Sequence, residues 1–328
     1  MDNNYLSYMI KNLKDVFTKF KDEAACRDFL VKQRWDGVPE CPHCGYRRSY
    51  IIDGGKKFKC ANRECYKKYS VTVGTIFEAS NIPLTTWFQA MYHIVNNKKG
   101  MSSTQLARHL GVTQKTAWFM THRIREALKE KNPRLLGDVV QADETFVGGK
   151  NKNRHDIKKF KNSSGGRSSE DKTPVLGAMA NGYVRLKVAK NTTAAEIAPF
   201  IKNNVRRGSI LVTDEYGAYR YAYPHCELVM MEHVHKEYVR GPFHTNSIEG
   251  FWSFLKRGYI GIYHYMSRKH LQRYCDEFAY RYNTRKLQDG ARFLLISGQI
   301  NGRLTYKQLV HGEISEKEAR KTIQAPGQ

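Results

Sequence analysis

The chain has 328 residues, of which 41% are hydrophobic, so its composition excludes a disordered protein and allows two or three domains with hydrophobic cores. Lys and Arg number 55 against 31 Asp and Glu, which gives a formal net charge of +24. This excess favours a polyanionic partner, with nucleic acid ahead of an anionic membrane surface.

No run of about 18 apolar residues occurs, and charged residues interrupt the N-terminal stretch, so we expect neither a transmembrane helix nor a secretory signal. The seven cysteines, an odd number, argue against a disulfide framework. We therefore expect a soluble protein in a reducing, cytoplasmic compartment, with no membrane partner.

The first expected domain, residues 1–37, is an N-terminal helical segment. Its apolar periodicity predicts one amphipathic helix from Asp15 to Trp35. Residues 38–75 follow as a second domain, and they contain four of the seven cysteines.

These four cysteines have the spacing Cys41-x2-Cys44-x15-Cys60-x4-Cys65. Two close pairs at this separation can surround one tetrahedral Zn²⁺ with thiolates, and the spacing disfavours the alternative of four reduced cysteines without a metal. Between the pairs, an Asp53-Gly54-Gly55 turn predicts a hairpin. We expect a zinc ribbon whose Zn²⁺ is structural, because four protein ligands leave no open coordination position.

Residues 76–132 are predicted as a helical DNA-binding region. Leu106 and Leu110 mark a first helix, Gly111 a turn and Thr113 the N-cap of a second helix, which is the pattern of a helix-turn-helix. A plain pair of antiparallel helices is the alternative. In the DNA-binding version, the start of the second helix meets the base edges and later basic residues lie near phosphate. The residues expected at the bases are Gln114, Lys115 and Thr116, and those expected near phosphate are His122, Arg123 and Arg125.

A third domain is predicted over residues 138–288, with a basic loop at 150–172, and residues 289–328 are expected to form a C-terminal tail. The order of strands and helices indicates a mixed sheet flanked by helices, as in the ribonuclease H-like fold. The whole chain is thus expected to be an α+β multidomain protein.

Three acidic residues of this domain lie far apart in the sequence but are expected at one rim of the sheet. Asp143 lies on the first strand, Asp214 ends the fourth, and Glu249 lies near the start of the following helix. Each has an ordinary alternative as a turn former or a helix-dipole partner. Together they match the oxygen ligands that a hard divalent cation requires. Glu144 and Glu215 each follow an aspartate and are expected to point to the opposite side of their strands.

Several motifs in this chain resemble the transposases of the IS1595 type, also called ISXO2-like, and the related Merlin elements. They are CPHCG with Cys60 and Cys65, YSVTVGTIFEASNIPLTTWF, ADETFVGGK, VTDEYGAY and HTNSIEGFWSFLKR. The resemblance extends from the cysteine cluster to about Arg285. It implies a DDE transposase that cleaves DNA at the ends of an insertion sequence and joins the freed 3′-OH to target DNA with Mg²⁺ (or Mn²⁺).

On this chain, the resemblance implies a catalytic triad of Asp143, Asp214 and Glu249. Lys256 follows Glu249 by seven residues, nearly two helical turns, so it is expected to reach phosphate from the same face. Asn246 is the rival for the third position, and His244 joins it as a supporting candidate. We prefer Glu249 because an ionised carboxylate neutralises a cation and an amide does not.

The implied partners are the terminal inverted repeats and target DNA, bound by a homo-oligomer. Two other hypotheses stay open from the sequence. One is a zinc-ribbon DNA-binding protein with an inactive ribonuclease H-like domain, and the other is a nuclease of the same fold that cuts without joining.

Overall fold

The computed structural model describes residues 10–148, 172–214, 217–231, 239–240 and 243–311. These residues belong to two compact units, which are described separately below. Unit 1 comprises Met1–Asn96, Ser103–Leu128 and Leu287–Gln328, and unit 2 comprises Asn97–Ser102 and Lys129–Lys286. Apart from Lys172, the basic loop predicted at 150–172 lies outside the described residues. No helix in the described part of the chain is both long enough and apolar enough to cross a membrane.

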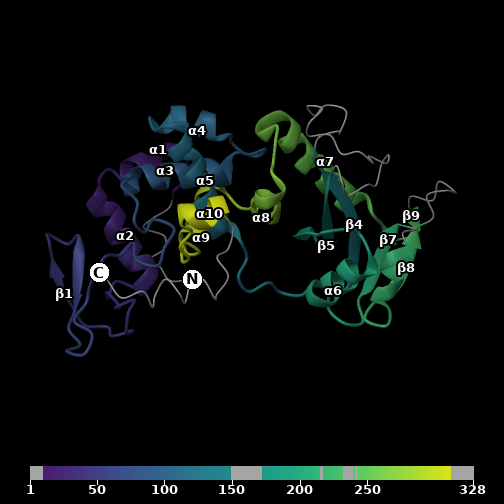
Figure 1. Cartoon of the computed structure of the whole chain (residues 1–328), viewed down its shortest axis with the longest axis horizontal. Coiled ribbons are helices and arrows are strands. Elements are labelled where there is room, and N and C mark those ends of the chain that lie inside the picture. The colour runs from purple at the N-terminus through teal and green to yellow at the C-terminus, as the bar shows by residue number, and fades with distance from the viewer. Residues whose placement is uncertain (1–9, 149–171, 215–216, 232–238, 241–242, 312–328) are drawn as a thin grey trace. The chain divides into compact units, whose positions relative to one another are not determined.

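Unit 1 combines helices with one small sheet (Figure 1). Its helices are α1 (Leu13–Lys19), α2 (Glu23–Trp35), α3 (Leu84–Asn96), α4 (Ser103–Leu110), α5 (Gln114–Leu128), α9 (Asp289–Ser297) and α10 (Tyr306–His311). Its strands are β1 (Ser49–Ile52), β2 (Lys57–Cys60) and β3 (Lys68–Tyr69). They pair antiparallel in the order β1-β2-β3, which confirms the predicted hairpin.

The single helix predicted from Asp15 to Trp35 is wrong, because the chain breaks between α1 and α2. Asp22 caps α2, and its side chain accepts the backbone N–H of Ala25 at 2.8 Å. Phe20 at the break is buried and makes edge contacts with Phe29 and Phe88. The break therefore directs an aromatic ring into the core of unit 1.

The C-terminal stretch expected as a tail instead contains α9 and α10. Phe293 on α9 is fully buried, with its ring 5.8 Å from that of Phe88 on α3. The side chain of Asn96 donates a hydrogen bond to the carbonyl of Asp289 at 3.2 Å. The described part of this stretch thus completes the core of unit 1.

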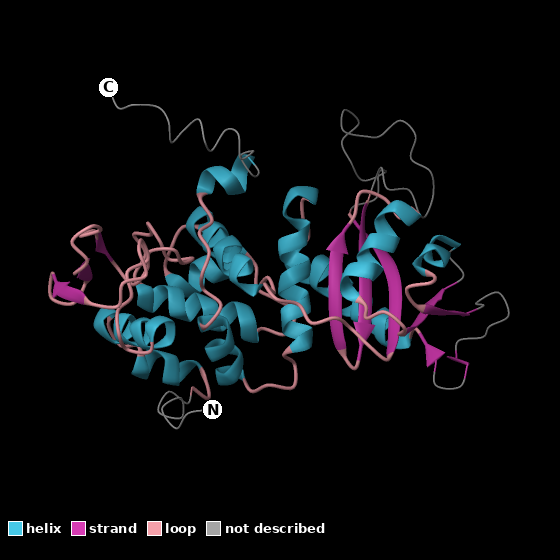
Figure 2. Ribbon diagram, turned by 90° about the horizontal axis from the view of Figure 1, so that it is seen from below, coloured by secondary structure: helices cyan, strands magenta, loops and turns pink. Residues whose placement is uncertain are grey.

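Unit 2 is built on a five-stranded sheet of order β6-β5-β4-β7-β8 (Figures 1 and 2). The strands are β4 (Val139–Val147), β5 (Thr173–Ala180), β6 (Tyr183–Val188), β7 (Ile210–Asp214) and β8 (Glu227–Met231). β4, β5 and β6 pair antiparallel, whereas β7 runs parallel to β4 and β8 parallel to β7. This order and these directions confirm the ribonuclease H-like fold.

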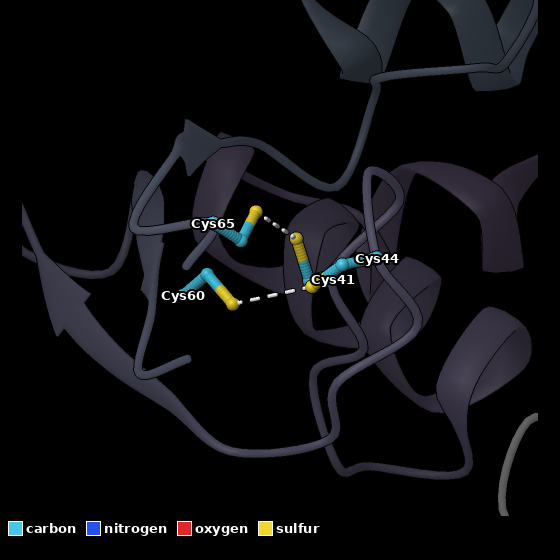
Figure 3. A group of neighbouring side chains, drawn as sticks. All are labelled: Cys41, Cys44, Cys60 and Cys65. Carbon is cyan, nitrogen blue, oxygen red and sulfur yellow. Dashed lines mark hydrogen bonds between the residues drawn. The ribbon is translucent and has the colours of Figure 1, made fainter. Parts of the chain in front are cut away.

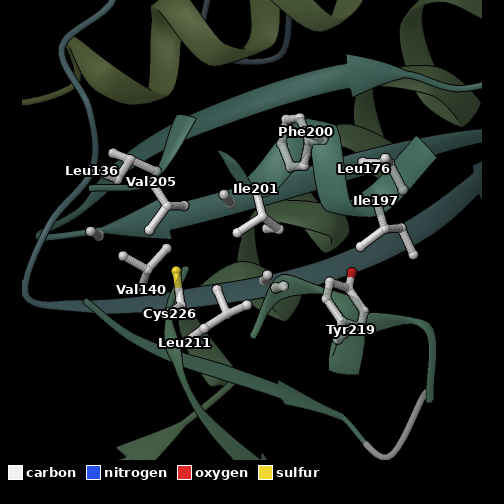
Figure 4. Packing of buried hydrophobic residues seen from close by; sticks show 14 of the residues in the cluster. Leu136, Val140, Leu176, Ile197, Phe200, Ile201, Val205, Leu211, Tyr219 and Cys226 are labelled. Carbon is white, nitrogen blue, oxygen red and sulfur yellow. The ribbon is translucent and has the colours of Figure 1, made fainter. Parts of the chain in front are cut away.

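Helices cover both faces of this sheet. The elements are α6 (Ala194–Asn204), η4 (Gly217–Ala222), α7 (Asn246–Gly258), η6 (Tyr259–Tyr263), η7 (Arg268–His270) and α8 (Leu271–Asn283), with a short hairpin of β9 (Val239–Arg240) and β10 (Phe243–His244) before α7. α6 and η4 pack on one face, over the cluster in Figure 4 that contains Val140, Ile201 and Leu211. α7 and α8 pack on the other face.

Alternation along β4 decides which residues meet which helix layer. Val140 and Ala142 are fully buried in the cluster under α6. Gln141 and Asp143 therefore face α7. The contacts that both residues make with α7 agree with this division.

Candidate functional site

The four cysteines of the ribbon converge on one point (Figure 3). Their sulfur atoms all lie within 4.8 Å of one another, with 3.8 Å between Cys41 and Cys65 and 3.6 Å between Cys44 and Cys60. A tetrahedral ion with Zn–S bonds of about 2.3 Å has S–S edges of about 3.8 Å. The cluster therefore fits a structural zinc ion.

Backbone donors support this cluster. The N–H groups of His43 and Cys44 point to the sulfur of Cys41, and those of Tyr46 and Lys67 point to Cys44 and Cys65. Such bonds stabilise thiolates, because the N–H dipoles face the negative sulfur. Beneath the cluster, the rings of Trp35, Phe58 and Tyr69 contact one another in a small aromatic core.

The helix pair α4 and α5 has the expected cap and turn. The hydroxyl of Thr113 accepts the N–H of Thr116 at 3.2 Å, and Gly111 adopts a positive φ of 65°. Gln114 and Lys115 are exposed at the start of α5. They are thus accessible to a ligand, as the helix-turn-helix hypothesis requires.

The phosphate contacts predicted for His122, Arg123 and Arg125 are wrong for this structure, because all three side chains are buried. Arg123 is only 4% exposed and donates to the carbonyl of Glu78. Its guanidinium also lies over the ring of Phe119. Burial lowers the pKa of Arg123 to about 10. These basic residues therefore belong to the interior of unit 1.

Asp143 and Asp214 lie side by side on neighbouring strands. β4 and β7 are parallel, with Gln141 opposite Val212, so two residues further along Asp143 comes opposite Asp214. Both aspartates are partly exposed, and both line one cavity of about 300 Å³. Its other lining residues are Glu144, Thr145, Phe146, Lys172 and Lys256.

Two hydrogen bonds hold the carboxylate of Asp143. Its Oδ1 accepts the backbone N–H of Glu144 at 2.8 Å, and its Oδ2 accepts the indole N–H of Trp252 at 2.9 Å. The indole lies against Gly177, the residue paired with Asp143 on β5. A Cβ at Gly177 would come within 2.6 Å of the indole ring, so this close approach requires glycine.

Burial raises the pKa of the Asp143 carboxyl to about 6. The carboxylates of Asp214 and Glu249 contribute to this rise, whereas the N–H groups of Glu144 and Trp252 oppose it. The tertiary structure thus brings the three predicted carboxylates into one electrostatic neighbourhood. Within the described residues, however, they are not gathered closely enough to form a metal-binding cluster like that of the cysteines.

The first turn of α7 presents both candidates for the third position. Asn246 and Glu249 are exposed there, and the carboxylate of Glu249 accepts a hydrogen bond from Thr245 at 2.7 Å. Lys256, further along the same helix, lines the cavity that contains Asp143 and Asp214. The phosphate contact of Lys256 stays a prediction.

Gln141 connects this helix to the sheet. Its Oε1 accepts the backbone N–H of Ile248 at 3.1 Å, and its Nε2 lies 3.3 Å from Nδ1 of His244. His244 thus lies beside the strand face that carries Asp143. Gln141 both orients the start of α7 and holds the imidazole of His244 in place.

Glu144 points away from Asp143, as predicted. Its Oε2 accepts the hydroxyl of Tyr219 at 3.1 Å, on the side of the sheet that α6 and η4 cover. Burial and the Glu144 carboxylate hold the pKa of Tyr219 well above its usual value. Glu215 lies outside the described residues.

Comparison with protein families agrees with this architecture. Residues 134–283 match the ISXO2-like transposase domain, and residues 21–68 match the transposase zinc-ribbon domain. The chain belongs to the ISXO2-like, IS1595-type transposase family. In this transposase, the matched segments contain the cysteine cluster and all three predicted catalytic carboxylates.

A relative supports the same assignment. A protein of the transposable element ISH50 from Halobacterium salinarum is 28% identical over 276 residues, which is 80% of this chain and 91% of the relative. Among solved structures, a pre-cleavage Mos1 transpososome is 12% identical over 66% of this chain and 79% of that chain, with a TM-score of 0.26. A Mos1 mariner paired-end complex with Mn is 13% identical over 63% of this chain and 78% of that chain, also with a TM-score of 0.26. These structural similarities are too low to support an inference.

Sequence reasoning missed the polar contacts that surround the carboxylates. Trp252 is a buried residue, 4% exposed, and its indole N–H also donates to Asp143. A signal was present, because Trp252 follows Glu249 by three residues and so shares its helix face. Gln141 had a similar signal, since it lies two residues before Asp143 on the same strand face.

Proposed function

We propose that the protein cleaves the ends of an insertion sequence and joins the freed 3′-OH to target DNA by metal-dependent phosphodiester displacement. Asp143, Asp214 and Glu249 are the proposed ligands of Mg²⁺ or Mn²⁺. Two such ions would activate the attacking oxygen and stabilise the leaving oxygen. The family membership of the chain supports a transposase.

The observation that carries this proposal is the adjacency of Asp143 and Asp214 in one open cavity, with Lys256 at its wall. Carboxylate oxygens are the ligands that hard divalent cations prefer. The raised pKa of Asp143 supports the fit, because burial and, to a smaller extent, the nearby carboxylates of Asp214 and Glu249 disfavour a negative charge that a bound cation would neutralise.

The other residues of the site have positioning and binding roles in this proposal. Trp252 and the N–H of Glu144 fix the orientation of the Asp143 carboxylate. Lys256 lines the cavity beside Asp143 and Asp214, and we assign its ammonium to a phosphate oxygen of the substrate. His244, held by Gln141, is assigned to the same substrate or to a water beside it.

A cleavage and strand-transfer assay on terminal inverted repeats tests this function. We expect activity with Mg²⁺ or Mn²⁺ and a loss of at least about a thousandfold in Asp143→Asn and Asp214→Asn, since each removes a charge from the ligand set. The matched control is Glu227→Gln, an exposed carboxylate on β8 that does not line this cavity. Cleavage that survives in both aspartate variants would refute the catalytic assignment.

The third ligand is tested separately. We expect Glu249→Gln to abolish cleavage and Asn246→Ala to reduce it only modestly, because the amide contributes no charge. The reverse pattern would assign the third position to Asn246. A protein that cleaves but never joins would be the nuclease of the same fold, and one that binds DNA without cleaving would be the inactive binding protein.

The remaining proposals concern DNA binding and assembly. We propose that Gln114, Lys115 and Thr116 meet DNA at the start of α5 and that the cysteine cluster binds a structural Zn²⁺. We also propose that two or more copies act together on the two element ends, at the nucleoid. Sedimentation of the protein with and without end-containing DNA tests this assembly.

A further inference from the structure

Unit 2 has a second cavity, of about 500 Å³, at the ends of β5 and β6. Its lining includes three basic residues, Lys187, Lys190 and Arg268, and one acidic residue, Glu196. The ammonium of Lys187 lies 2.8 Å from the Glu196 carboxylate, so the acid neutralises one of the three cations. The cavity therefore has a net positive charge, and its rim residues Lys190 and Arg268 are exposed.

This cavity adjoins the one that contains the aspartates. Lys172 lines the catalytic cavity, and the next residue, Thr173, lines the second. Thr173 pairs with Val147 at the end of β4, so both cavities open at the same end of the sheet. β4 and β6 are separated by two strand spacings, about 10 Å. One nucleic-acid strand can therefore reach both cavities.

Lys172 in the catalytic cavity and Lys190 and Arg268 in the second cavity provide cations along one route, as binding of a continuous phosphate backbone requires. A strand whose scissile phosphate lies at Asp143 would pass Lys172 and reach Lys190 and Arg268 a few nucleotides away. The basic excess of the whole chain agrees with such a path.

We propose that the cavity lined by Lys187, Lys190, Glu196 and Arg268 binds the phosphate backbone of the DNA strand that enters the catalytic cavity. This assignment rests on the proposed function, and it gives that function a defined substrate path. Glu196 has a specific part in it. By pairing with Lys187, it limits how tightly the strand is held.

The first test measures the binding of a duplex oligonucleotide that carries one element end at several salt concentrations, without added Mg²⁺ or Mn²⁺. We expect the double variant Lys190→Ala with Arg268→Ala to bind more weakly and to lower the slope of log affinity against log salt by about 2, since each phosphate contact contributes about 0.9. The matched control is Lys202→Ala, an exposed lysine on α6 that does not line the cavity. An unchanged slope in the double variant would overturn the proposal.

The second test is a variant that should gain binding. Glu196→Gln removes the acid and releases Lys187, so we expect binding to tighten by about fivefold and the salt slope to steepen by about 1. Damage to the fold cannot produce tighter binding, which separates the proposed role from a structural one. Unchanged or weaker binding by a folded Glu196→Gln variant would refute the part assigned to Glu196.

These measurements are independent of catalysis. If the wild-type protein fails to cleave with metal, the proposed function fails even where the salt slopes behave as expected. If the wild-type protein cleaves normally and the substitutions in this cavity do not change the salt slope of DNA binding, the catalytic assignment stands and this cavity is not part of the DNA path.

Discussion

Asp143 and Glu144 show how one residue step separates two chemical roles. Both are carboxylates on β4, but Asp143 faces α7 and receives a hydrogen bond from Trp252, whereas Glu144 receives one from Tyr219 on the opposite face. Successive side chains of a strand point to opposite faces. Both residues line the cavity that contains Asp214, but only Asp143 is directed toward α7, the helix that carries Glu249.

At this scale we predict that Trp252→Phe raises the Mg²⁺ concentration needed for half-maximal cleavage by about tenfold. The variant keeps an aromatic ring but loses the N–H that orients Asp143, and hydrogen bonds to charged groups contribute about 1.5–3 kcal/mol. Activity should recover at high Mg²⁺. The control is Phe251→Leu, a buried neighbour on α7, which should lower the melting temperature without changing the metal requirement.

Helix α5 shows how an element divides basic residues between surface and interior. Lys115 lies exposed in its first turn, whereas Arg123, two turns later, is buried and bonded to the carbonyl of Glu78. The apolar face of the helix is wider than the sequence pattern indicated, because the surrounding elements of unit 1 cover it. The charge of a side chain thus does not by itself make it a DNA contact.

We predict opposite phenotypes for these two residues. Lys115→Ala should weaken DNA binding and reduce the salt slope by about 1, with little effect on stability. Arg123→Met should leave the salt slope unchanged and lower the free energy of unfolding of unit 1 by about 1–3 kcal/mol, because it leaves a buried carbonyl unbonded. Titration of labelled duplex DNA and chemical denaturation measure the two effects. A lower salt slope in Arg123→Met would instead show that Arg123 contacts a phosphate.

The whole molecule consists of two units that the chain enters more than once. Residues 97–102 leave α3 and belong to unit 2, where Arg281 donates to the carbonyl of Asn97 at 3.2 Å. The chain then returns to unit 1 for α4 and α5, and again for α9 and α10. Each unit nevertheless has its own hydrophobic core, so the two can unfold separately.

We predict that calorimetry shows two unfolding transitions and that removal of zinc lowers the midpoint temperature of only one of them. Cys44→Ser should abolish zinc binding, measured as metal content per chain, and should shift the transition of unit 1. The transition of unit 2 should stay in place, because none of the cysteine ligands belongs to it. One cooperative transition that moves as a whole would contradict the separation of the units.

The sequence alone determined the features that depend on local pattern. Cysteine spacing predicted the ribbon cluster, and the Asp53-Gly54-Gly55 turn predicted its hairpin. The order of strands and helices predicted the ribonuclease H-like sheet, and strand alternation predicted that Glu144 points away from Asp143. These features could be predicted because ligand spacing, turn chemistry and side-chain periodicity are properties of neighbouring residues.

Only the tertiary structure decided the features that depend on residues distant in the sequence. It broke the first helix at Asp22, enclosed Arg123 and used the C-terminal helix α9 to complete the core of unit 1. It also brought Trp252 to Asp143 across 109 positions of sequence. It placed Gly177 against the indole ring, where a Cβ atom would collide with the ring. Burial and long-range contacts arise when separate elements pack together, and no local pattern encodes which distant partner a side chain will meet.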